Sequence, residues 1–345
     1  MTLPPQPEVS VEVLAPYLAD TVPGFGTLES LRKFSDGQSN PTYALTASSG
    51  RYVLRTQPMG ALLKSAHQVD REYRVMQALG GSGVPVPRMV HLARGTGPLG
   101  RDFYVMAHLE GRVLWDPALP DCRAEERTAI YDEMNRVLAA LHDVDPAAVG
   151  LSDFGRPGNY YERQFSRWSK QYQASMLEPL PQMDALIDWV GKEMPPDDGV
   201  VSLVHGDWRI DNLMFAPEAP RIIGVLDWEI STLGHPISDL AYQCMQWRLP
   251  NSGSMRGLGG VDRSAIGLPS EAEYVARYCA RRGIGKLDNW PFYLAFSFFR
   301  LIAILQGVAR RAHDGNASNP EKARELAEAI PVLAQLATDV IEKET

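Results

Sequence analysis

The order of apolar and polar residues changes character about a third of the way along the chain. Before Gly111, short apolar runs are separated by turn-rich stretches, which predicts strands over 31–34, 42–46, 51–55, 88–92 and 103–106. Between residues 65 and 79 the apolar residues recur every three or four positions, which predicts one helix. We therefore expect the first hundred residues to form an antiparallel sheet that carries a helix.

The rest of the chain is typical of a helical domain. Apolar positions at helical spacing predict helices over 124–142, 159–176, 181–194, 236–245, 271–282, 290–311 and 321–343. We expect the last of these to kink at Pro331, because proline cannot donate the helical hydrogen bond. The fold class is therefore α+β, with a β-rich nucleotide-binding lobe over 1–107 and a helical lobe with the catalytic loop and substrate site over 108–345.

Composition narrows the class of protein. The formal net charge of −8 argues against nucleic acid as a partner, since nucleic-acid binders present a basic face. The three cysteines are widely spaced and no secretory leader is visible, so we expect free thiols and a cytoplasmic protein. The long apolar stretch 292–309 carries Arg300 at its centre, which favours a buried helix over a membrane span.

Three oxygen-bearing residues form the clearest chemical pattern. Asp207 follows the apolar run 203–204, Asn212 comes five positions later, and Asp227 ends a second apolar run fifteen positions further on. Phosphoryl transfer from a nucleotide needs a carboxylate that orients and deprotonates the attacking hydroxyl group, and oxygen ligands that hold Mg²⁺. The pattern predicts such a site in a short β-hairpin inserted into the helical lobe.

Motifs around these residues resemble a known family. His205-Gly206-Asp207-x-x-x-x-Asn212 with Leu226-Asp227-Trp228 is similar to the catalytic-loop and metal-site signature of aminoglycoside phosphotransferases and choline kinase-like proteins. The segments 34–43, 234–242 and 315–318 resemble more narrowly the phosphotransferase-like domain of acyl-CoA dehydrogenase family members ten and eleven. The resemblance covers nearly the whole chain and implies the bilobal fold of protein kinases.

The resemblance also implies roles for residues of the catalytic loop. Asp207 is the expected catalytic base, and Asn212 and Asp227 are the expected Mg²⁺ ligands. Arg209 either neutralises the transferring phosphoryl group or pairs with a neighbouring carboxylate. His205 is expected to hold the loop in place, and Asp239 to brace it from the following helix.

A second set of residues is expected to bind ATP. Arg55 stands where protein kinases carry a phosphate-binding lysine, and Glu72 matches its carboxylate partner. Met106, His108 and Leu109 fall where the adenine edge would bind. The phosphate-covering loop contributes backbone N–H groups and polar side chains, from Ser35, Gly37, Ser39 and Asn40.

The sequence does not identify the molecule that accepts the phosphoryl group. We expect a hydroxyl-bearing small molecule and a monomer or homodimer that binds no membrane. Arg248, Arg256, Arg263 and Arg300 favour an anionic acceptor, one candidate being a hydroxyacyl-CoA. The alternatives are a kinase for aminoglycoside-like or choline-like substrates and a regulatory pseudokinase that binds nucleotide without transferring phosphate. Arg55 and the glycine-poor loop favour the pseudokinase, whereas the presence of Asp207, Asn212 and Asp227 opposes it.

Overall fold

The computed structural model describes residues 8–34, 40–60, 67–95, 97–253, 255–316 and 319–343. The chain divides into two compact units, one of them made of Met1–Arg112, Met214–Pro217 and Ile223–Ile230. The other consists of Val113–Leu213, Glu218–Ile222 and Ser231–Thr345. The first unit thus extends five residues beyond the boundary predicted at residue 107 and includes two segments from the predicted second lobe. Hydrogen bonds explain this grouping, since the Val225 N–H donates to the Pro85 carbonyl over 2.8 Å.

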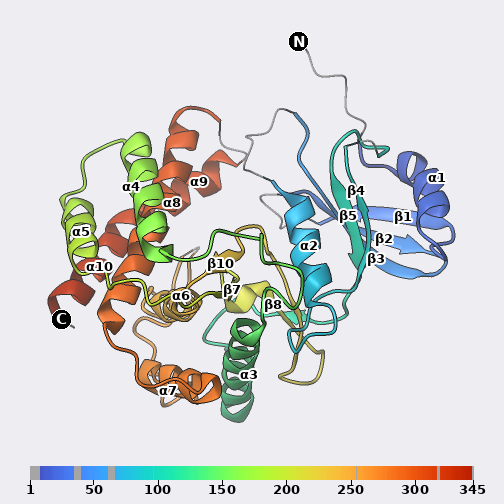
Figure 1. Ribbon diagram of the computed structural model, residues 1–345. Helices are drawn as coiled ribbons and strands as arrows, with labels where there is room; N and C mark the ends of the chain where they lie inside the picture. The colour runs from blue at the N-terminus through green and yellow to red at the C-terminus, as the bar shows by residue number, and fades with distance from the viewer. Residues whose placement is uncertain are drawn as a thin grey trace. The chain divides into compact units, whose positions relative to one another are not determined.

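The first unit is built on a five-stranded sheet, shown in Figure 1. The strands lie in the order β1-β2-β3-β5-β4, and every neighbouring pair is antiparallel. Their bounds are β1 (Leu28–Lys33), β2 (Thr42–Ala47), β3 (Gly50–Thr56), β4 (Met89–Ala93) and β5 (Phe103–Ala107). The antiparallel sheet and the mixed α+β class are those predicted from the sequence.

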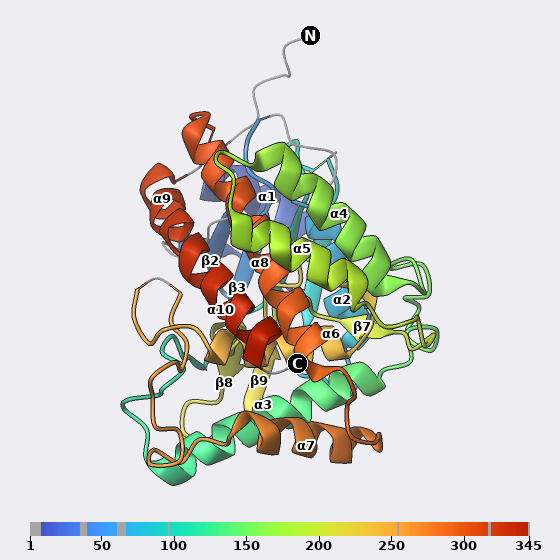
Figure 2. The same cartoon turned by 90° about the vertical axis from the view of Figure 1, so that its left-hand side faces the viewer.

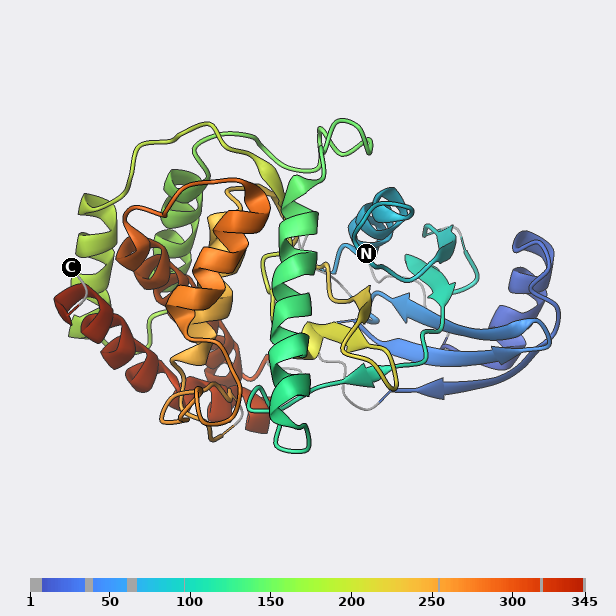
Figure 3. The same ribbon diagram turned by 90° about the horizontal axis from the view of Figure 1, so that it is seen from below.

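Side chains along β3 and β5 point alternately to the two faces of this sheet, and the two faces have different surroundings. Leu54 and Val105 point to one face, where they pack with Leu14 and Leu18 of α1 (Val11–Thr21) in a buried apolar cluster. Figure 3 shows α1 beside strands β1 to β3. The sequence patterns did not predict α1, which contains Pro16 within its 11 residues. The residues in between, such as Val53 and Tyr104, point to the other face and line a cavity.

The remaining elements of the first unit close that second face. Helix α2 (Val69–Leu79) contacts β4 and β5. A further three-stranded sheet has the order β6-β8-β9, with β6 (Arg112–Val113), β8 (Leu213–Phe215) and β9 (Ile222–Val225). A Cβ atom on Gly111 would lie 2.5 Å from the backbone carbonyl oxygen of Phe215, so glycine allows the close approach of the two backbones here.

The second unit is helical, and α8 (Trp290–His313) is its central element. Helix α8 contacts five other helices, with α4, α5 and α10 lying beside it in Figure 2. The bounds of these and the other helices are α3 (Ala124–Asp143), α4 (Tyr160–Ser175), α5 (Pro181–Lys192), α6 (Ile237–Trp247), α7 (Glu271–Arg282), α9 (Pro320–Glu328) and α10 (Ile330–Lys343). The helix predicted over 321–343 is in fact two helices, because Pro331 lies in the first turn of α10.

Helix α8 is also the one described helix whose length and apolar character suit a membrane span. Within its most apolar window, 83% of the residues are buried inside the protein. Arg300 in the middle of this helix is 6% exposed, and its guanidinium lies 5.4 Å from the centre of the Tyr242 ring. These contacts are those of a core helix, as the charged centre of the stretch predicted.

Candidate active site

The predicted catalytic loop, which contains Asp207, is fixed by one buried carboxylate of the second unit. Asp239, in the first turn of α6, is fully buried and accepts hydrogen bonds from the backbone N–H groups of His205 (2.7 Å) and Gly206 (2.8 Å). A third contact joins Asp239 Oδ2 to His142 Nε2 at 3.2 Å. Burial raises the pKa of Asp239, but the hydrogen bond from His142 and the loop N–H groups outweigh it, so the pKa lies below its usual value. Asp239 is therefore an ionised anchor for the loop.

Gly206 allows the loop to turn sharply between this anchor and Asp207. Its φ of 86° is in the left-handed region, which side chains with a Cβ rarely adopt. The Gly206 carbonyl accepts a hydrogen bond of 2.7 Å from the buried Arg300 of α8. Both polar groups of Gly206 are thus bonded to helices, and the backbone around it has little freedom to move.

Asp207 lies in this loop, with a quarter of its side chain exposed. Its Oδ2 accepts a hydrogen bond of 2.9 Å from Asn212 Nδ2, and Tyr242 donates a second hydrogen bond to the carboxylate. Burial raises the pKa of Asp207, but the nearby positive charge of Arg209 and these hydrogen bonds outweigh it and lower the pKa. The carboxylate is held in its ionised form, which is the form that accepts a proton.

Asn212 is oriented by the same contact. It ends the short 3-10 turn Ile210–Asn212, is 9% exposed, and donates from Nδ2 to both the backbone carbonyl (2.8 Å) and the carboxylate of Asp207. Because the amide nitrogen is used in this way, the amide oxygen is the atom that remains for a cation. A hard oxygen donor suits Mg²⁺.

Arg209 pairs with a neighbouring carboxylate, one of the two roles predicted for it. Its Nη2 lies 2.5 Å from Asp211 Oδ2, and its Nε lies 3.7 Å from Asp207 Oδ1. Asp211 is therefore the main carboxylate partner of Arg209. His205 is fully buried, and its Nδ1 accepts a hydrogen bond from the Asp207 N–H over 3.2 Å, in keeping with a structural role.

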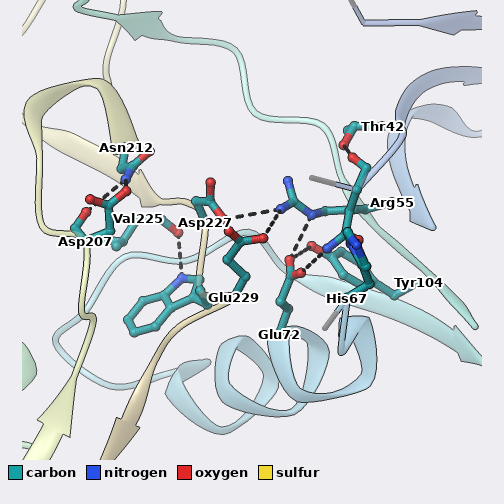
Figure 4. Close-up of polar contacts among 12 residues, drawn as sticks. Thr42, Arg55, His67, Glu72, Tyr104, Asp207, Asn212, Val225, Asp227 and Glu229 are labelled. Carbon is teal, nitrogen blue, oxygen red and sulfur yellow. Dashed lines mark hydrogen bonds and ion pairs between the residues drawn. The ribbon is translucent and has the colours of Figure 1, made fainter. Parts of the chain in front are cut away.

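In the first unit, Arg55 lies between two carboxylates, as Figure 4 shows. Its Nε is 2.9 Å from Glu72 Oε2, although this N–H is not directed along a hydrogen bond, and its Nη2 donates to Asp227 Oδ1 over 3.2 Å. Glu229 Oε2 is 3.9 Å from the same Nη2. Arg55 therefore connects the predicted partner Glu72 with the predicted metal ligand Asp227.

Glu72 is 1% exposed and is bonded on both oxygens. It accepts hydrogen bonds from Asn40 Nδ2 (2.8 Å) and from the Tyr104 hydroxyl (3.0 Å). Burial raises the pKa of Glu72 to about 7, although the Arg55 guanidinium opposes this shift. The Asn40 side chain is itself 1% exposed, and its Oδ1 lies 2.9 Å from His67 Nδ1.

Asn40 was predicted to cap phosphate oxygens, and its side chain links Glu72 to His67 inside the first unit. Its role toward phosphate stays a prediction. The other loop residues named for that task, Ser35, Gly37 and Ser39, lie outside the described residues.

Asp227 has a backbone conformation that is unusual for a residue with a side chain. Its φ is 61°, in the left-handed region. The next turn is held by Trp228, which is 1% exposed and whose Nε1 donates to the Val225 carbonyl over 3.0 Å. The local strain is thus maintained by packing, and strained residues held in this way are concentrated at functional sites.

A cavity of about 520 Å³ in the first unit is bordered by these charged groups. Val53, Met214 and Leu226 provide apolar walls, while Arg55 and Asp227 lie at its polar part. Met106, His108 and Leu109, the residues predicted to meet adenine, also line it. Sequence reasoning did not identify Met214, and no local signal marks it, because it reaches the cavity through the pairing of β8 with β6 and β9.

The segment after β5 borders this cavity and contains a backbone N–H group that is not used within the protein. The Ala107 N–H donates to the Arg88 carbonyl and the His108 N–H to the Arg51 carbonyl. Within the described residues, the next N–H group, that of Leu109, has no hydrogen-bond partner. An unbonded N–H beside apolar walls fits the edge of a planar heterocycle with a nitrogen acceptor.

The basic residues that favoured an anionic acceptor are mostly used inside the second unit. Arg248 makes a two-point ion pair with Glu271 (3.0 and 2.6 Å), and Arg256 lies 3.0 Å from Asp116. Arg300 donates to Gly206, and the Arg263 guanidinium lies 5.7 Å from the centre of the Trp247 ring. Their positions give the anionic-acceptor interpretation no support of its own.

Comparisons with known proteins concern the chain as a whole. The model of the "Phosphotransferase enzyme family" matches residues 30–296. Acyl-CoA dehydrogenase family member 10 of Mus musculus is 44% identical over 320 residues, which cover 92% of this chain and 30% of the mouse protein. Acyl-CoA dehydrogenase family member 11 of Rattus norvegicus is 41% identical, with 92% of this chain and 41% of the rat protein covered. The chain therefore spans less than half the length of these relatives.

Solved structures of phosphotransferases are also similar to this chain. A "putative aminoglycoside phosphotransferase" from Ralstonia eutropha is 46% identical, with a TM-score of 0.87 and with 96% of this chain and 98% of that chain covered. A spectinomycin phosphotransferase solved with ADP and spectinomycin has a TM-score of 0.65 at 12% identity, with 97% and 99% covered. The latter similarity is one of fold alone.

Replacement of the anchor tests how the loop is held. We expect Asp239→Ala to lower the free energy of unfolding by about 3–5 kcal/mol, because two buried N–H groups lose their acceptor. Urea unfolding followed by circular dichroism measures this change. Asp314→Ala, which removes an exposed partner of Arg310, is the matched control and should cost about 0.5 kcal/mol or less. Equal effects of the two variants would contradict the anchoring role.

His142 gives this arrangement a dependence on pH. Burial lowers the pKa of His142, against the opposing effect of Asp239, so the unfolded chain takes up a proton first as the pH falls below about 6.5. The contribution of His142 to the free energy of unfolding should therefore fall between pH 7.5 and 5.5, whereas Glu72, whose pKa burial raises to about 7, contributes in the opposite direction over this interval. Asp239, with its lowered pKa, adds a loss only below about pH 4. Urea unfolding of the protein and of His142→Gln at both pH values isolates the His142 contribution. On going from pH 7.5 to 5.5 the variant should lose less stability, or gain more, than the unchanged protein; the same change in both would show that His142 does not contribute.

Proposed function

Because the chain belongs to the phosphotransferase enzyme family, we propose that it is an ATP-dependent kinase that phosphorylates a hydroxyl group of a small molecule. The observation that supports this proposal most directly is how the Asp207 carboxylate is ionised, oriented and held in place. This carboxylate is ionised, oriented by Asn212 and Tyr242, and part of a loop fixed by Asp239. A general base needs the same three properties.

In the proposed reaction, the Asp207 carboxylate orients the acceptor hydroxyl group and takes its proton. The acceptor oxygen then forms a bond to the γ-phosphorus, while the bond between this phosphorus and the β–γ bridging oxygen breaks and ADP leaves. Such a reaction depends mostly on positioning and on stabilisation of charge. This is why a loop with little freedom is useful to the enzyme.

The cavity of the first unit supports ATP as the phosphate donor. Its apolar walls and the Leu109 N–H suit adenine, and Arg55 provides positive charge for the phosphates. The Arg55 guanidinium offers several N–H donors in a plane where a lysine offers a point charge. Because Arg55 also donates a hydrogen bond to Asp227, a bound phosphate would have to share or replace that hydrogen bond.

Mg²⁺ is the cation that fits the available donors. The Asn212 amide oxygen and the Asp227 carboxylate are hard oxygen ligands. Among the described residues no group of three or more His, Cys, Asp or Glu side chains forms a metal site, so the rest of the coordination shell would come from phosphate and water. A bound Mg²⁺ ion would neutralise charge on the phosphates, and the contribution of the chain would be to hold these two oxygens.

For the acceptor, we propose a hydroxyacyl-CoA. The support comes from the acyl-CoA dehydrogenase family members, which are 41–44% identical to this chain. The name of the Ralstonia protein favours an aminoglycoside instead. The alternative function is that of a pseudokinase, which binds nucleotide without transferring phosphate. The ion pair between Arg55 and Asp227 is the observation that favours this alternative.

The role of Asp207 is tested by ADP release with Mg²⁺ and ATP in the presence of 4-hydroxyacyl-CoAs, aminoglycosides, choline and small sugars. We expect a 4-hydroxyacyl-CoA to accelerate ADP release. Asp207→Asn should lower the turnover number by about two orders of magnitude or more while ATP still binds. Asp121→Asn, a change of an exposed carboxylate in the same unit, is the matched control.

Two outcomes would contradict this proposal in different ways. Undiminished turnover by Asp207→Asn would remove the residue from the reaction. If aminoglycosides alone accelerated ADP release, phosphoryl transfer would still be supported, but a hydroxyacyl-CoA would be excluded as the acceptor.

Arg55→Gln tests the nucleotide cavity. The variant loses a charged donor, whose hydrogen bonds contribute about 1.5–3 kcal/mol, so we expect ATP to bind roughly tenfold to a hundredfold more weakly. Adenosine carries no phosphate, so its dissociation constant should change little. Calorimetric titration with both compounds measures this difference. An equal loss for ATP and adenosine would show a general disturbance of the cavity, and no loss for ATP would exclude phosphate contact by Arg55.

A further inference from the structure

Asn40 is a buried polar residue of the first unit whose backbone is tied to the strand that carries Arg55. It lies two residues before β2 and is 1% exposed. Its carbonyl accepts a hydrogen bond of 3.0 Å from the Thr42 hydroxyl group. The next carbonyl, that of Pro41, accepts a hydrogen bond of 3.0 Å from the N–H of Thr56, which follows Arg55 at the end of β3. The backbone at Asn40 is therefore fixed to this strand end.

The side chain of Asn40 is oriented by two partners that need different atoms. Its Nδ2 donates to Glu72 Oε1 over 2.8 Å, and its Oδ1 lies 2.9 Å from His67 Nδ1. The reverse orientation would place the amide oxygen against an oxygen of the ionised carboxylate, and neither atom could donate. The amide therefore has one orientation, in which the carboxylate accepts from its nitrogen and His67 donates to its oxygen.

Glu72 is held on both of its carboxylate oxygens. Oε1 accepts from Asn40, whereas Oε2 accepts from the Tyr104 hydroxyl group over 3.0 Å and lies 2.9 Å from Arg55 Nε. Figure 4 shows Tyr104 and Arg55 beside this carboxylate. The last torsion of a glutamate side chain is soft, so contacts to one oxygen alone leave the carboxylate able to turn. The hydrogen bond from Asn40 to the other oxygen fixes its plane.

The same hydrogen bond favours the charge of Glu72. Burial raises the pKa of Glu72 to about 7, and the Arg55 guanidinium and the hydrogen bonds from Tyr104 and Asn40 oppose this effect. Because Glu72 is 1% exposed, water cannot easily replace a lost donor. Loss of the Asn40 amide would let the carboxylate turn and would favour its neutral form. Both changes weaken its contact with the guanidinium.

We propose that Asn40 is a positioning residue for the phosphates of the nucleotide, and that it acts through Glu72 and Arg55 without touching phosphate itself. This role rests on the proposed function, because it takes Arg55 as the group that binds the phosphates. While Glu72 holds the Nε side of Arg55, the Nη atoms remain for Asp227 and for phosphate. The burial of Asn40 supports the indirect role, since a direct contact needs an accessible polar atom.

The test is calorimetric titration of the full chain with ATP and with adenosine, which has the base and the sugar of ATP but no phosphate. Asn40→Ala should weaken ATP binding about tenfold and leave the dissociation constant of adenosine unchanged. Asn40→Leu, which keeps the approximate shape of the side chain without its polar atoms, should show the same pattern. Gln77→Ala removes an exposed amide from α2, the helix of Glu72, and should change neither constant.

A double-mutant cycle separates the indirect role from a direct contact. If Asn40 acts through Arg55, Asn40→Ala should weaken ATP binding by less than about twofold when Arg55→Gln is already present. If Asn40 caps a phosphate oxygen itself, the loss of about tenfold should persist in the Arg55→Gln protein. The melting temperatures show whether the variants are folded, and adenosine binding shows whether their cavity is intact.

Three results would overturn the role of Asn40 while ATP still binds to the unchanged protein. These are undiminished ATP binding by both Asn40 variants, an equal loss for ATP and adenosine, or the full loss on adding Asn40→Ala to Arg55→Gln. No binding of ATP by the unchanged protein is a different result, because it would refute the nucleotide site of the proposed function and this role with it.

Discussion

The hydrogen bonds of one buried carboxylate determine the shape of the site on which the proposed function depends. Asp239 accepts from two successive N–H groups of the catalytic loop and from His142. All of these groups are buried, so none of them has water as a substitute partner. The loop is therefore fixed to the first turn of α6, and the orientation of Asp207 follows from it. A base fixed in advance avoids the entropy that would be lost if it had to be ordered during the reaction.

The residues predicted to bind the nucleotide are held by a shared guanidinium group instead of a single buried carboxylate. Arg55 is shared between Glu72, which is buried, and Asp227, whose backbone is strained. A guanidinium can make both contacts because its donors lie in a planar fork, which a lysine lacks. The Glu72 carboxylate is fixed in turn, because Asn40 and Tyr104 both donate hydrogen bonds to it. Arg55 is therefore held in place by several neighbouring residues of the first unit.

Local patterns predicted the elements well where the signals themselves are local. Helix α7 has the predicted bounds because Ser270 and Glu273 form a capping box at its start and Gly283 ends it in the left-handed conformation. Features that depend on distant contacts were missed. Asn40 is buried by Glu72, 32 residues away, and Tyr242 reaches Asp207 from another element. The motif from His205 to Asp227 indicated the chemistry, but no spacing in the sequence could place Tyr242 beside the base.

In the proposed reaction, a phosphoryl group passes from ATP to a carbon-bound hydroxyl group. Phosphorus NMR of the protein with Mg²⁺, ATP and the acceptor that most accelerates ADP release tests it most directly. We expect a new phosphomonoester resonance that grows in step with ADP and is absent with Asp207→Asn. ATP that binds but yields no phosphomonoester with any acceptor, or only inorganic phosphate, would contradict the account.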